Sequence, residues 1–237
     1  MTDGNGRVLA VSMKVPSCFV DPSQIKNPDE VAALLTPHIR GISPEKLKKA
    51  LNKKSLFAWI ERKMETKRAT AIKALKIKGV YFQKEYKRYY PRESMAANLL
   101  GFVGMDDRGL EGIEYFYDKI MKCDSGYAMY KGDVRGYEIP ESNREEKPPE
   151  GGFDLVLSID EVIQHIVEEE VGNVYRKYKA ESAMGIVMDP HTGEILAMAN
   201  FPSYNLNSFA NTKASTRRNR VITDMFEPGS TFKLIMA

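Results

Sequence analysis

The sequence contains few residues that could form covalent or metal-bound cross-links. Among its 237 residues are two cysteines, Cys18 and Cys123, which stand more than a hundred positions apart. This spacing excludes a disulfide framework and the paired cysteines of a zinc site. The three histidines, His38, His165 and His191, also lack the spacing of metal ligands. We therefore expect neither a metal nor a disulfide framework.

Long apolar runs are absent as well. No stretch approaches the roughly 18 consecutive apolar residues of a membrane-spanning helix. The first residues, MTDGNGRVLAVSM, lack the charged and apolar regions of a signal peptide. With 43% apolar and 28% charged residues, the composition suits a globular chain of one large or two modest domains. The sequence on its own predicts a soluble chain, which could be the soluble part of a longer protein.

Charge is spread unevenly along the chain. Residues 46–92 contain sixteen Lys and Arg against three Glu, whereas residues 133–170 contain twelve acids against three bases. Such asymmetry indicates at least two structural units. We interpret the basic segment as the solvated face of helices, with binding of anionic envelope polymers or lipid headgroups as the alternative.

Hydrophobic spacing predicts helices in the first third of the chain. Residues 28–39 form one, and Ser43 starts a second as its N-cap. We predict a third, longer helix from the cap Ser55 to a stop at Gly79, with Trp59 on its buried face. The same kinds of signal predict strands at 80–91 and 153–159, helices at 94–102 and 112–121, a hairpin at 126–140 and a linker at 141–152.

The last third is predicted to contain a long helix and a pair of strands. Asp160 is a good N-cap for the helix. The apolar residues expected to point inward from it are Val162, Ile163, Ile166, Val167, Val171 and Val174. Residues 168–170, three glutamates, look like exposed helix surface. Strands at 183–189 and 194–200 should pair, exposing edges and an apolar face. We therefore expect residues after about Asn200 to be poorly packed.

The segment EPGSTFK places a serine, Ser230, three residues before a lysine, Lys233. A helix starting at Pro228 would put both side chains on one face, with the partial positive charge of its N-terminus near Ser230. A neighbouring amine that is held uncharged can take the serine proton. The spacing alone is weak evidence, because Ser43 and Lys46 share it and a capped helix with an exposed lysine explains most such pairs.

The surroundings of this pair give the chain a resemblance to class B penicillin-binding proteins, the peptidoglycan D,D-transpeptidases of elongation, division and sporulation. Seven blocks carry the resemblance, and they occur in the family's order over nearly the whole chain. They are DGNGRVLAVS with VDP (3–12, 20–22), KRYYP (87–91), NLLGFVG (98–104), GLEGIEYFYD (109–118), LSID with Gln164 (157–164), MDPHTGEILAMANFPSYN (188–205) and RNRVITDMFEPGSTFK (218–233).

The resemblance implies an α+β fold with two domains. Residues 1–150 would form an elongated pedestal, or dimerisation, domain of helices and β-hairpins. Residues 151–237 would be the incomplete start of a penicillin-recognising α/β transpeptidase domain. Cys123 stands about where the family usually has a glycine, which puts a tight turn in doubt but nothing catalytic.

The resemblance also implies the chemistry. Ser230 would attack the D-Ala-D-Ala carbonyl of a peptidoglycan stem peptide, and Lys233 would accept its proton. An acyl-enzyme would form and pass to a neighbouring amine, and β-lactams would acylate the same serine. No cofactor, no metal and no nucleic acid is implied. Membrane proteins of cell-wall synthesis and a second copy of the chain are the expected protein partners.

Two further family motifs, Ser-x-Asn and Lys-Thr-Gly, do not follow Ser230. Residues 203–205 (SYN) and 191–193 (HTG) match by letters or nearly so, but both lie upstream of Ser230. We therefore expect the chain to be the N-terminal part of a longer enzyme and to be inactive alone. In the family a membrane helix precedes the first block, so the parent would be anchored in the plasma membrane with its bulk outside.

Two alternatives remain at the level of sequence. The chain could act as a non-catalytic interaction module for the cell-wall synthesis machinery. It could instead be a penicillin-sensing receptor or a β-lactamase relative, although those proteins lack the blocks between residues 98 and 118.

Overall fold

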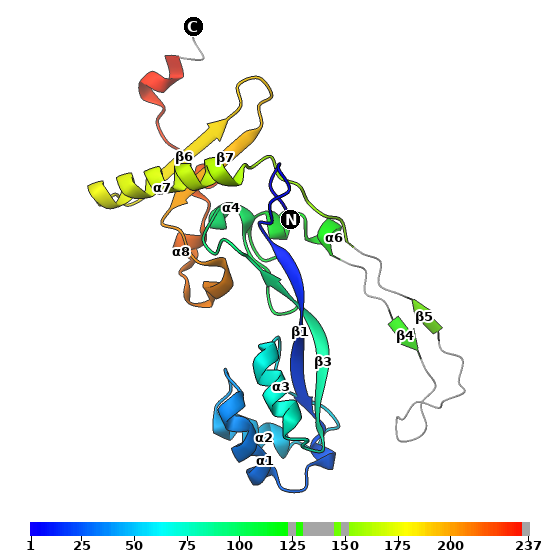
Figure 1. Cartoon of the computed structure of the whole chain (residues 1–237). Coiled ribbons are helices and arrows are strands. Elements are labelled where there is room, and N and C mark those ends of the chain that lie inside the picture. Colours follow the sequence, from blue (N-terminus) through cyan, green and yellow to red (C-terminus); the bar gives the residue numbers. More distant parts are fainter. Residues whose placement is uncertain (123–126, 130–144, 148–151, 234–237) are drawn as a thin grey trace. The chain divides into compact units, whose positions relative to one another are not determined.

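A computed structural model describes residues 1–122, 127–129, 145–147 and 152–233 (Figure 1). The chain divides into two compact units: the basic unit, Val11–Tyr89, and the larger unit, Met1–Ala10 with Tyr90–Ala237. The α+β class is confirmed. Cys123 and the predicted domain boundary at residue 150 lie outside the described residues. No helix within the described ranges is long and apolar enough to cross a membrane.

The basic unit is built on a three-stranded antiparallel sheet. Its strands are β1 (Val11–Val20), β2 (Ala58–Glu61) and β3 (Val80–Tyr89), in the order β2-β1-β3. Side chains alternate across a strand, so Cys18 and Val20 share one face of β1 and are fully buried. The residues that pack with them come largely from helices α1 (Pro28–Leu35), α2 (Pro44–Leu51) and α3 (Thr66–Ala74).

The predicted long helix after Ser55 is wrong. The segment forms strand β2, a short connection and helix α3, and the Ser55 hydroxyl donates to the Phe57 carbonyl at 2.9 Å instead of capping a helix. In β2 the side chains of Ala58 and Ile60 are buried, whereas Trp59 between them is half-buried. The pairing of β2 with β1 imposes a period of two on residues whose spacing is also compatible with a helix.

Other predictions in the basic unit are confirmed. Helix α1 and the following 3-10 helix η2 (Thr36–His38) occupy the predicted helix 28–39, and β3 is the predicted strand. The Ser43 hydroxyl accepts a hydrogen bond from the Lys46 backbone N–H at 3.3 Å, at the N-terminus of α2. The pair Ser43 and Lys46 is thus part of a helix cap.

In the larger unit, the predicted helix 112–121 is two short helices, α5 (Gly112–Phe116) and α6 (Asp118–Met121). The predicted helix 94–102 shrinks to α4 (Ala97–Leu100). Strand β4 (Tyr127–Met129) pairs with β5 (Glu145–Lys147), so β5 lies inside the predicted linker and the linker prediction is wrong there. The rest of the hairpin predicted at 126–140 lies outside the described residues.

Glycine is required where α4 and α5 approach each other. Gly101 has φ +71°, and a Cβ added there would lie 1.8 Å from the Glu111 carbonyl oxygen. A side chain would therefore force the two backbone segments apart. This close approach gives a structural reason for the glycine-rich blocks between residues 98 and 118.

The N-terminal residues pack against the segment that precedes the long helix. The predicted strand 153–159 makes only a single bridge, from Val156 to Thr2. The buried Asp3 carboxylate accepts backbone hydrogen bonds from Asn5 at 2.9 Å, Arg7 at 2.8 Å and Glu161 at 3.1 Å. Burial by itself raises the pKa of Asp3, but these backbone donors outweigh it and hold the pKa below its usual range.

The long helix α7 (Glu161–Tyr178) begins where predicted. The Asp160 carboxylate accepts from the backbone N–H groups of Val162 at 2.8 Å and Ile163 at 3.0 Å. The prediction for its apolar residues is wrong in part, because Val162, Ile166 and Val174 are about half exposed. The face that packs on the hairpin includes the predicted Val167 and Val171, which lie against Gly185 of β6, together with the buried Glu161, Gln164 and Gly172.

The predicted strand pair is confirmed as β6 (Ala183–Met188) and β7 (Ile195–Phe201), which are antiparallel. The chain continues through η3 (Leu206–Asn211), α8 (Ala214–Arg217), α9 (Arg220–Thr223) and η4 (Gly229–Phe232). The prediction of poor packing directly after Asn200 is wrong, because Tyr204 and Leu206 are buried in the core of the larger unit. Beyond them, Met225 and Phe226 are exposed.

A buried ion pair on the sheet of the basic unit yields a prediction. Glu85 accepts from Arg62 at 2.6 Å and from the hydroxyl of the fully buried Ser17. The hydrogen bond from Arg62 is the largest influence on the pKa of Glu85 and lowers it, although burial opposes it. We expect Glu85→Gln to lower the free energy of unfolding by about 2 kcal/mol at neutral pH, measured by urea unfolding.

The pH dependence gives the prediction its sign. The pKa of Glu85 in the folded chain lies below the unfolded value of 4.5, so its stabilisation is present above that pH and is lost as the pH falls through the folded pKa. At acid pH, the free energies of unfolding of the unsubstituted chain and of Glu85→Gln should therefore become similar. The control is Glu65→Gln, whose side chain is 62% exposed and should cost only a few tenths of a kcal/mol. Equal losses in both variants at neutral pH would contradict the prediction.

Candidate active site

Ser230 and Lys233 lie at the described end of the chain. Ser230 is in the 3-10 helix η4, and Lys233 directly follows it. The sequence predicts an α-helix that starts at Pro228, whereas the structure has a 3-10 helix that begins at Gly229 and ends at Phe232, one residue before Lys233. Both side chains are exposed, and within the described chain no hydrogen bond joins them. The structure thus places a hydroxyl and an amine three residues apart at the described end of the chain, both open to water.

The two segments that resemble the missing motifs have structural roles. In the SYN segment, the buried Tyr204 donates its hydroxyl to the Ala97 carbonyl at 3.2 Å, and burial raises its pKa. Asn205 accepts from the Asn207 N–H at 2.8 Å and so caps η3. The HTG segment forms the turn between β6 and β7, where the His191 N–H donates to the Asp189 carboxylate at 2.7 Å. These contacts explain both segments without catalysis.

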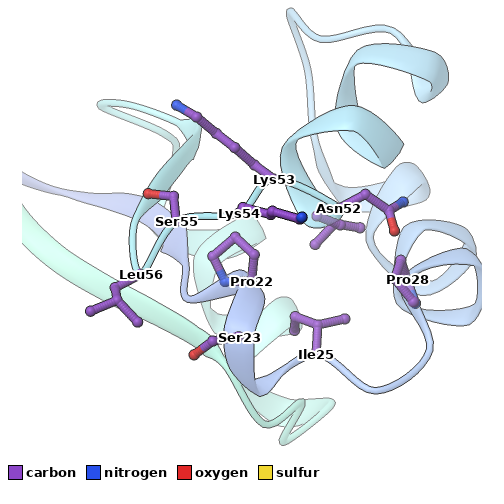
Figure 2. A pocket seen from close by; sticks show the side chains of 10 residues that line it. Pro22, Ser23, Ile25, Pro28, Asn52, Lys53, Lys54, Ser55 and Leu56 are labelled. Carbon is purple, nitrogen blue, oxygen red and sulfur yellow. The ribbon is translucent and has the colours of Figure 1, made fainter. Parts of the chain in front are cut away.

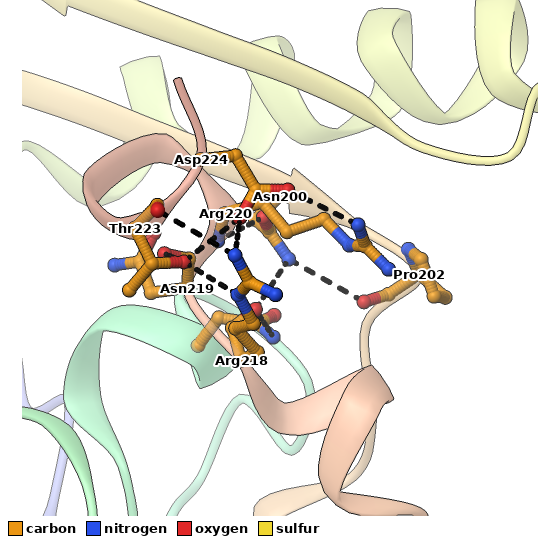
Figure 3. A network of polar contacts seen from close by, with 8 residues as sticks. Asn200, Pro202, Arg218, Asn219, Arg220, Thr223 and Asp224 are labelled. Atoms are coloured by element: carbon orange, nitrogen blue, oxygen red, sulfur yellow. Dashed lines mark hydrogen bonds and ion pairs between the residues drawn. The ribbon is translucent and has the colours of Figure 1, made fainter.

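A buried amide holds the chain that leads to Ser230. Asn200, at the end of β7, accepts a hydrogen bond from the Arg220 backbone N–H at 2.9 Å (Figure 3). Its amide nitrogen lies 3.4 Å from the Arg218 carbonyl and 3.5 Å from the Pro202 carbonyl. The side chain therefore fixes the start of α9 to strand β7.

A second amide reaches the same segment from α4. Asn98 donates to the Thr216 carbonyl at 2.7 Å and to the Arg218 carbonyl at 3.3 Å. The ion pair between Arg217 and Glu111, at 2.9 Å, adds a further link to the region of α5. The blocks around residues 98–111 and the segment 216–218 are thus joined within one compact unit.

Asp224 organises the exit from α9 toward Ser230. Its carboxylate pairs with Arg218, and with Arg220 at 3.1 Å, and it accepts from the Thr223 hydroxyl at 3.0 Å (Figure 3). Burial raises the pKa of Asp224, but the Thr223 hydrogen bond and the two arginines outweigh it and keep the pKa below its usual range. The carboxylate is therefore held in its charged form beside two cations, six residues before Ser230.

Two side chains of α7 complete the frame. The Gln164 amide accepts from the Met198 N–H at 2.7 Å and donates to the Met198 carbonyl at 3.0 Å, which ties α7 to β7. Glu168 accepts from the Ala96 N–H at 2.6 Å and from Gln164 at 2.8 Å, and burial raises its pKa. The prediction that Glu168 is exposed helix surface is therefore wrong.

Sequence reasoning missed the supporting residues Asn98, Asn200 and Glu168. Asn98 and Asn200 are buried and Glu168 is half-buried, each through contacts with a distant segment, and such contacts leave no periodic signal. Their only trace is that Asn98 and Asn200 fall inside blocks that carry the resemblance. Within the described ranges, no three His, Cys, Asp or Glu side chains gather in a way that could hold a metal ion.

The role of Asn200 can be tested by its substitution. Asn200→Ala would leave the buried Arg220 N–H without its partner, which costs about 1–3 kcal/mol of local stability. We expect trypsin to cleave after Arg218 or Arg220 roughly tenfold faster than in the unsubstituted chain, measured by mass spectrometry. The control is Asn173→Ala, because Asn173 on α7 is exposed. Unchanged cleavage after Asn200→Ala would contradict the proposed support.

Two models of protein families match the chain. The model described as the penicillin-binding protein dimerisation domain matches residues 1–157. The model described as the penicillin-binding protein transpeptidase domain matches residues 183–237, which include Asn200, Asp224, Ser230 and Lys233.

Curated relatives and solved structures agree with these matches. Stage V sporulation protein D of Bacillus subtilis is 35% identical over 98% of this chain and 36% of its own length. Peptidoglycan D,D-transpeptidase FtsI of Escherichia coli is 36% identical over 98% of the chain and 40% of its length. The chain thus spans about two-fifths of the length of these relatives.

The solved structures show the same fold. A peptidoglycan synthetase from Bifidobacterium adolescentis aligns with a TM-score of 0.66 at 25% identity, over 98% of this chain and 47% of that one. PBP2 in its complex with MreC from Helicobacter pylori aligns with a TM-score of 0.67 at 25% identity, over 88% and 42%.

Proposed function

The chain belongs to the penicillin-binding proteins of class B, the peptidoglycan D,D-transpeptidases, and from this we propose that it provides the dimerisation domain and the nucleophile segment of such an enzyme. The observation that carries the proposal is the segment from Arg218 to Lys233. Its start is fixed by Asn98, Asn200 and Asp224, and it leads to an exposed serine and an exposed lysine three residues apart.

In the proposed reaction, the Ser230 Oγ attacks the carbonyl carbon between the two D-alanines of a stem peptide. The hydroxyl proton passes to the uncharged amine of Lys233, and the Ser230 backbone N–H helps to stabilise the oxyanion. When the peptide bond breaks, the leaving D-alanine takes up the proton and the stem peptide stays on Ser230 as an ester. An amine of a second stem peptide then attacks this ester, which forms the cross-link and restores the serine. A β-lactam would acylate Ser230 in the same way.

The remaining parts of the proposal concern the whole protein. We place the whole protein on the outer side of the plasma membrane, held by a membrane anchor, and we assign it no cofactor. Its dimerisation domain would end and its transpeptidase domain would begin at about residue 150. The match of residues 1–157 to the dimerisation domain favours this assignment over a penicillin-sensing receptor or a β-lactamase.

The activity of the 237-residue chain itself can be tested with a fluorescent penicillin. Ser230 and Lys233 are exposed, and the Ser-x-Asn and Lys-Thr-Gly motifs do not follow them in this chain. A lysine serves as a base only when it is held uncharged, and the oxyanion needs a second donor. We therefore expect no labelling above that of Ser230→Ala, measured by gel fluorescence. Efficient labelling that disappears in Ser230→Ala would contradict this expectation.

A second candidate function is that of a non-catalytic interaction module. The observation that favours it is the charge of the basic unit, which has eighteen Lys and Arg against seven Asp and Glu, a formal charge of +11. We expect the whole chain to form complexes with the extracytoplasmic parts of purified cell-wall synthesis proteins, measured by sedimentation velocity. A chain that stays monomeric alone and in every such mixture would count against this function.

A further inference from the structure

Four aromatic rings gather on the face of the sheet that the helices of the basic unit leave open. Cys18 and Val20 are buried in the helix-covered core, so Phe19 between them points to the opposite face. The Phe19 ring centroid lies 4.9 Å from that of Phe57, 6.0 Å from that of Trp59 and 5.6 Å from that of Tyr81. We call these four residues the aromatic cluster. Phe57 is 40% exposed and Tyr81 is 41% exposed, so the cluster presents apolar surface to solvent.

A hollow of about 510 Å³ is lined in part by Leu56, the residue before Phe57 (Figure 2). Its apolar lining comes from Pro22, Ile25, Pro28, Leu51 and Leu56, and its polar lining from Ser23, Asn52, Lys53, Lys54 and Ser55. Leu56, which is 68% exposed, directly precedes Phe57 of the cluster. The Tyr81 hydroxyl donates to Gln24 at 2.8 Å, next to Ser23 and Ile25. Leu56, next to Phe57, and Gln24, next to Ser23 and Ile25, therefore connect the aromatic cluster with the lining of the hollow.

The charged groups around the hollow are predominantly positive. Lys53 and Lys54 are exposed, and neither forms an ion pair within the described chain. Of the nearby carboxylates, Asp29 pairs with Lys48 at 2.8 Å and Asp21 accepts from Ser23 at 2.6 Å and Gln24 at 2.6 Å. Figure 2 shows the Lys54 side chain lying across the hollow toward Asn52, while Lys53 extends away from it. The two lysines are thus available to an anionic partner.

We propose that the aromatic cluster and the hollow together bind an acidic segment of another protein, with its apolar side chains on Leu56 and Phe57 and its carboxylates on Lys53 and Lys54. The proposal rests on the second candidate function and specifies the partner's chemistry. Apolar surface next to unpaired lysines fits a chain that alternates apolar and acidic residues. The formal charge of +11 on the unit would attract such a segment over a distance of about a Debye length.

Two other occupants fit less well. A symmetric contact with a second copy would bring two basic units of charge +11 together, which is electrostatically unfavourable. An anionic bilayer would satisfy the lysines, but side chains of a peptide can enter the hollow, whereas the flat surface of lipid headgroups matches it poorly. The observations therefore favour a protein segment.

Trp59 is the only tryptophan of the chain and belongs to the cluster, so its emission reports directly on this surface. The probe is a short synthetic peptide in which glutamates flank two phenylalanines, titrated into the whole chain at low salt. We expect a saturable blue shift of the Trp59 emission. Two double variants should each weaken the affinity for the peptide about tenfold or more. The first is Leu56→Ala with Phe57→Ala, and the second is Lys53→Glu with Lys54→Glu.

The matched control is Lys67→Glu with Lys87→Glu, which changes the net charge equally at exposed lysines that do not line the hollow. This variant should bind the peptide with little change, and circular dichroism checks the fold of every variant. Equal weakening by the control would mean unspecific attraction to the basic unit and would overturn the proposal. Peptide binding that is unchanged in the variant Leu56→Ala with Phe57→Ala would overturn the proposal as well.

The remaining outcomes separate the other occupants. A shift with phosphatidylglycerol vesicles but not with the peptide would assign the surface to a membrane instead. If sedimentation shows dimers of the chain, and Leu56→Ala with Phe57→Ala dissociates them, the surface binds a second copy. If the peptide does not bind while purified cell-wall proteins still bind the chain, this surface is excluded as the binding site. The second candidate function, an interaction module, remains supported in that case.

Discussion

The hydrogen bond between the Asn200 side chain and the Arg220 backbone is the contact on which the candidate active site depends. Asn200 is buried at the end of β7, and α7 holds that strand through the paired hydrogen bonds of Gln164 to Met198. A buried N–H must find a partner, so the position of Arg220 follows from the position of the strand. Asp224 then sets the direction in which the chain leaves α9 toward Ser230.

The same network explains why the compact units of the fold differ from the two family domains. The dimerisation match covers residues 1–157, yet residues 1–10 and 90–122 form one compact unit with residues 152–233. Asp3 binds the first turn of α7, and Asn98 of α4 binds the Thr216 and Arg218 carbonyls in the segment that leads to Ser230. Residues of the dimerisation domain thus help to support the chain that leads to Ser230, while Val11–Tyr89 forms its own core.

The basic unit combines a stable interior with an unusual surface. Its helices cover one face of the sheet, and its two well-ordered carboxylates, Glu61 and Glu85, are engaged by Arg68 at 2.7 Å and Arg62 at 2.6 Å. These acids lie against arginines of the same unit, which leaves most of the lysines as solvent-exposed positive charge. Sheet pairing also places Phe19, Trp59 and Tyr81 side by side on the open face, although they come from three separate strands.

The sequence by itself determined the local features: the caps Ser43 and Asp160, strand β3, the antiparallel pair β6 and β7, and the spacing of Ser230 and Lys233. These depend on neighbouring residues, so propensity and periodicity are sufficient to predict them. Only the tertiary structure decided that residues 58–61 form a strand, that part of the apolar stripe of α7 is exposed, that Asn98 and Asn200 are buried, and that Glu168 binds the Ala96 backbone. Those outcomes depend on partners far away in the chain, because pairing with β1 or burial against α4 overrides local preference.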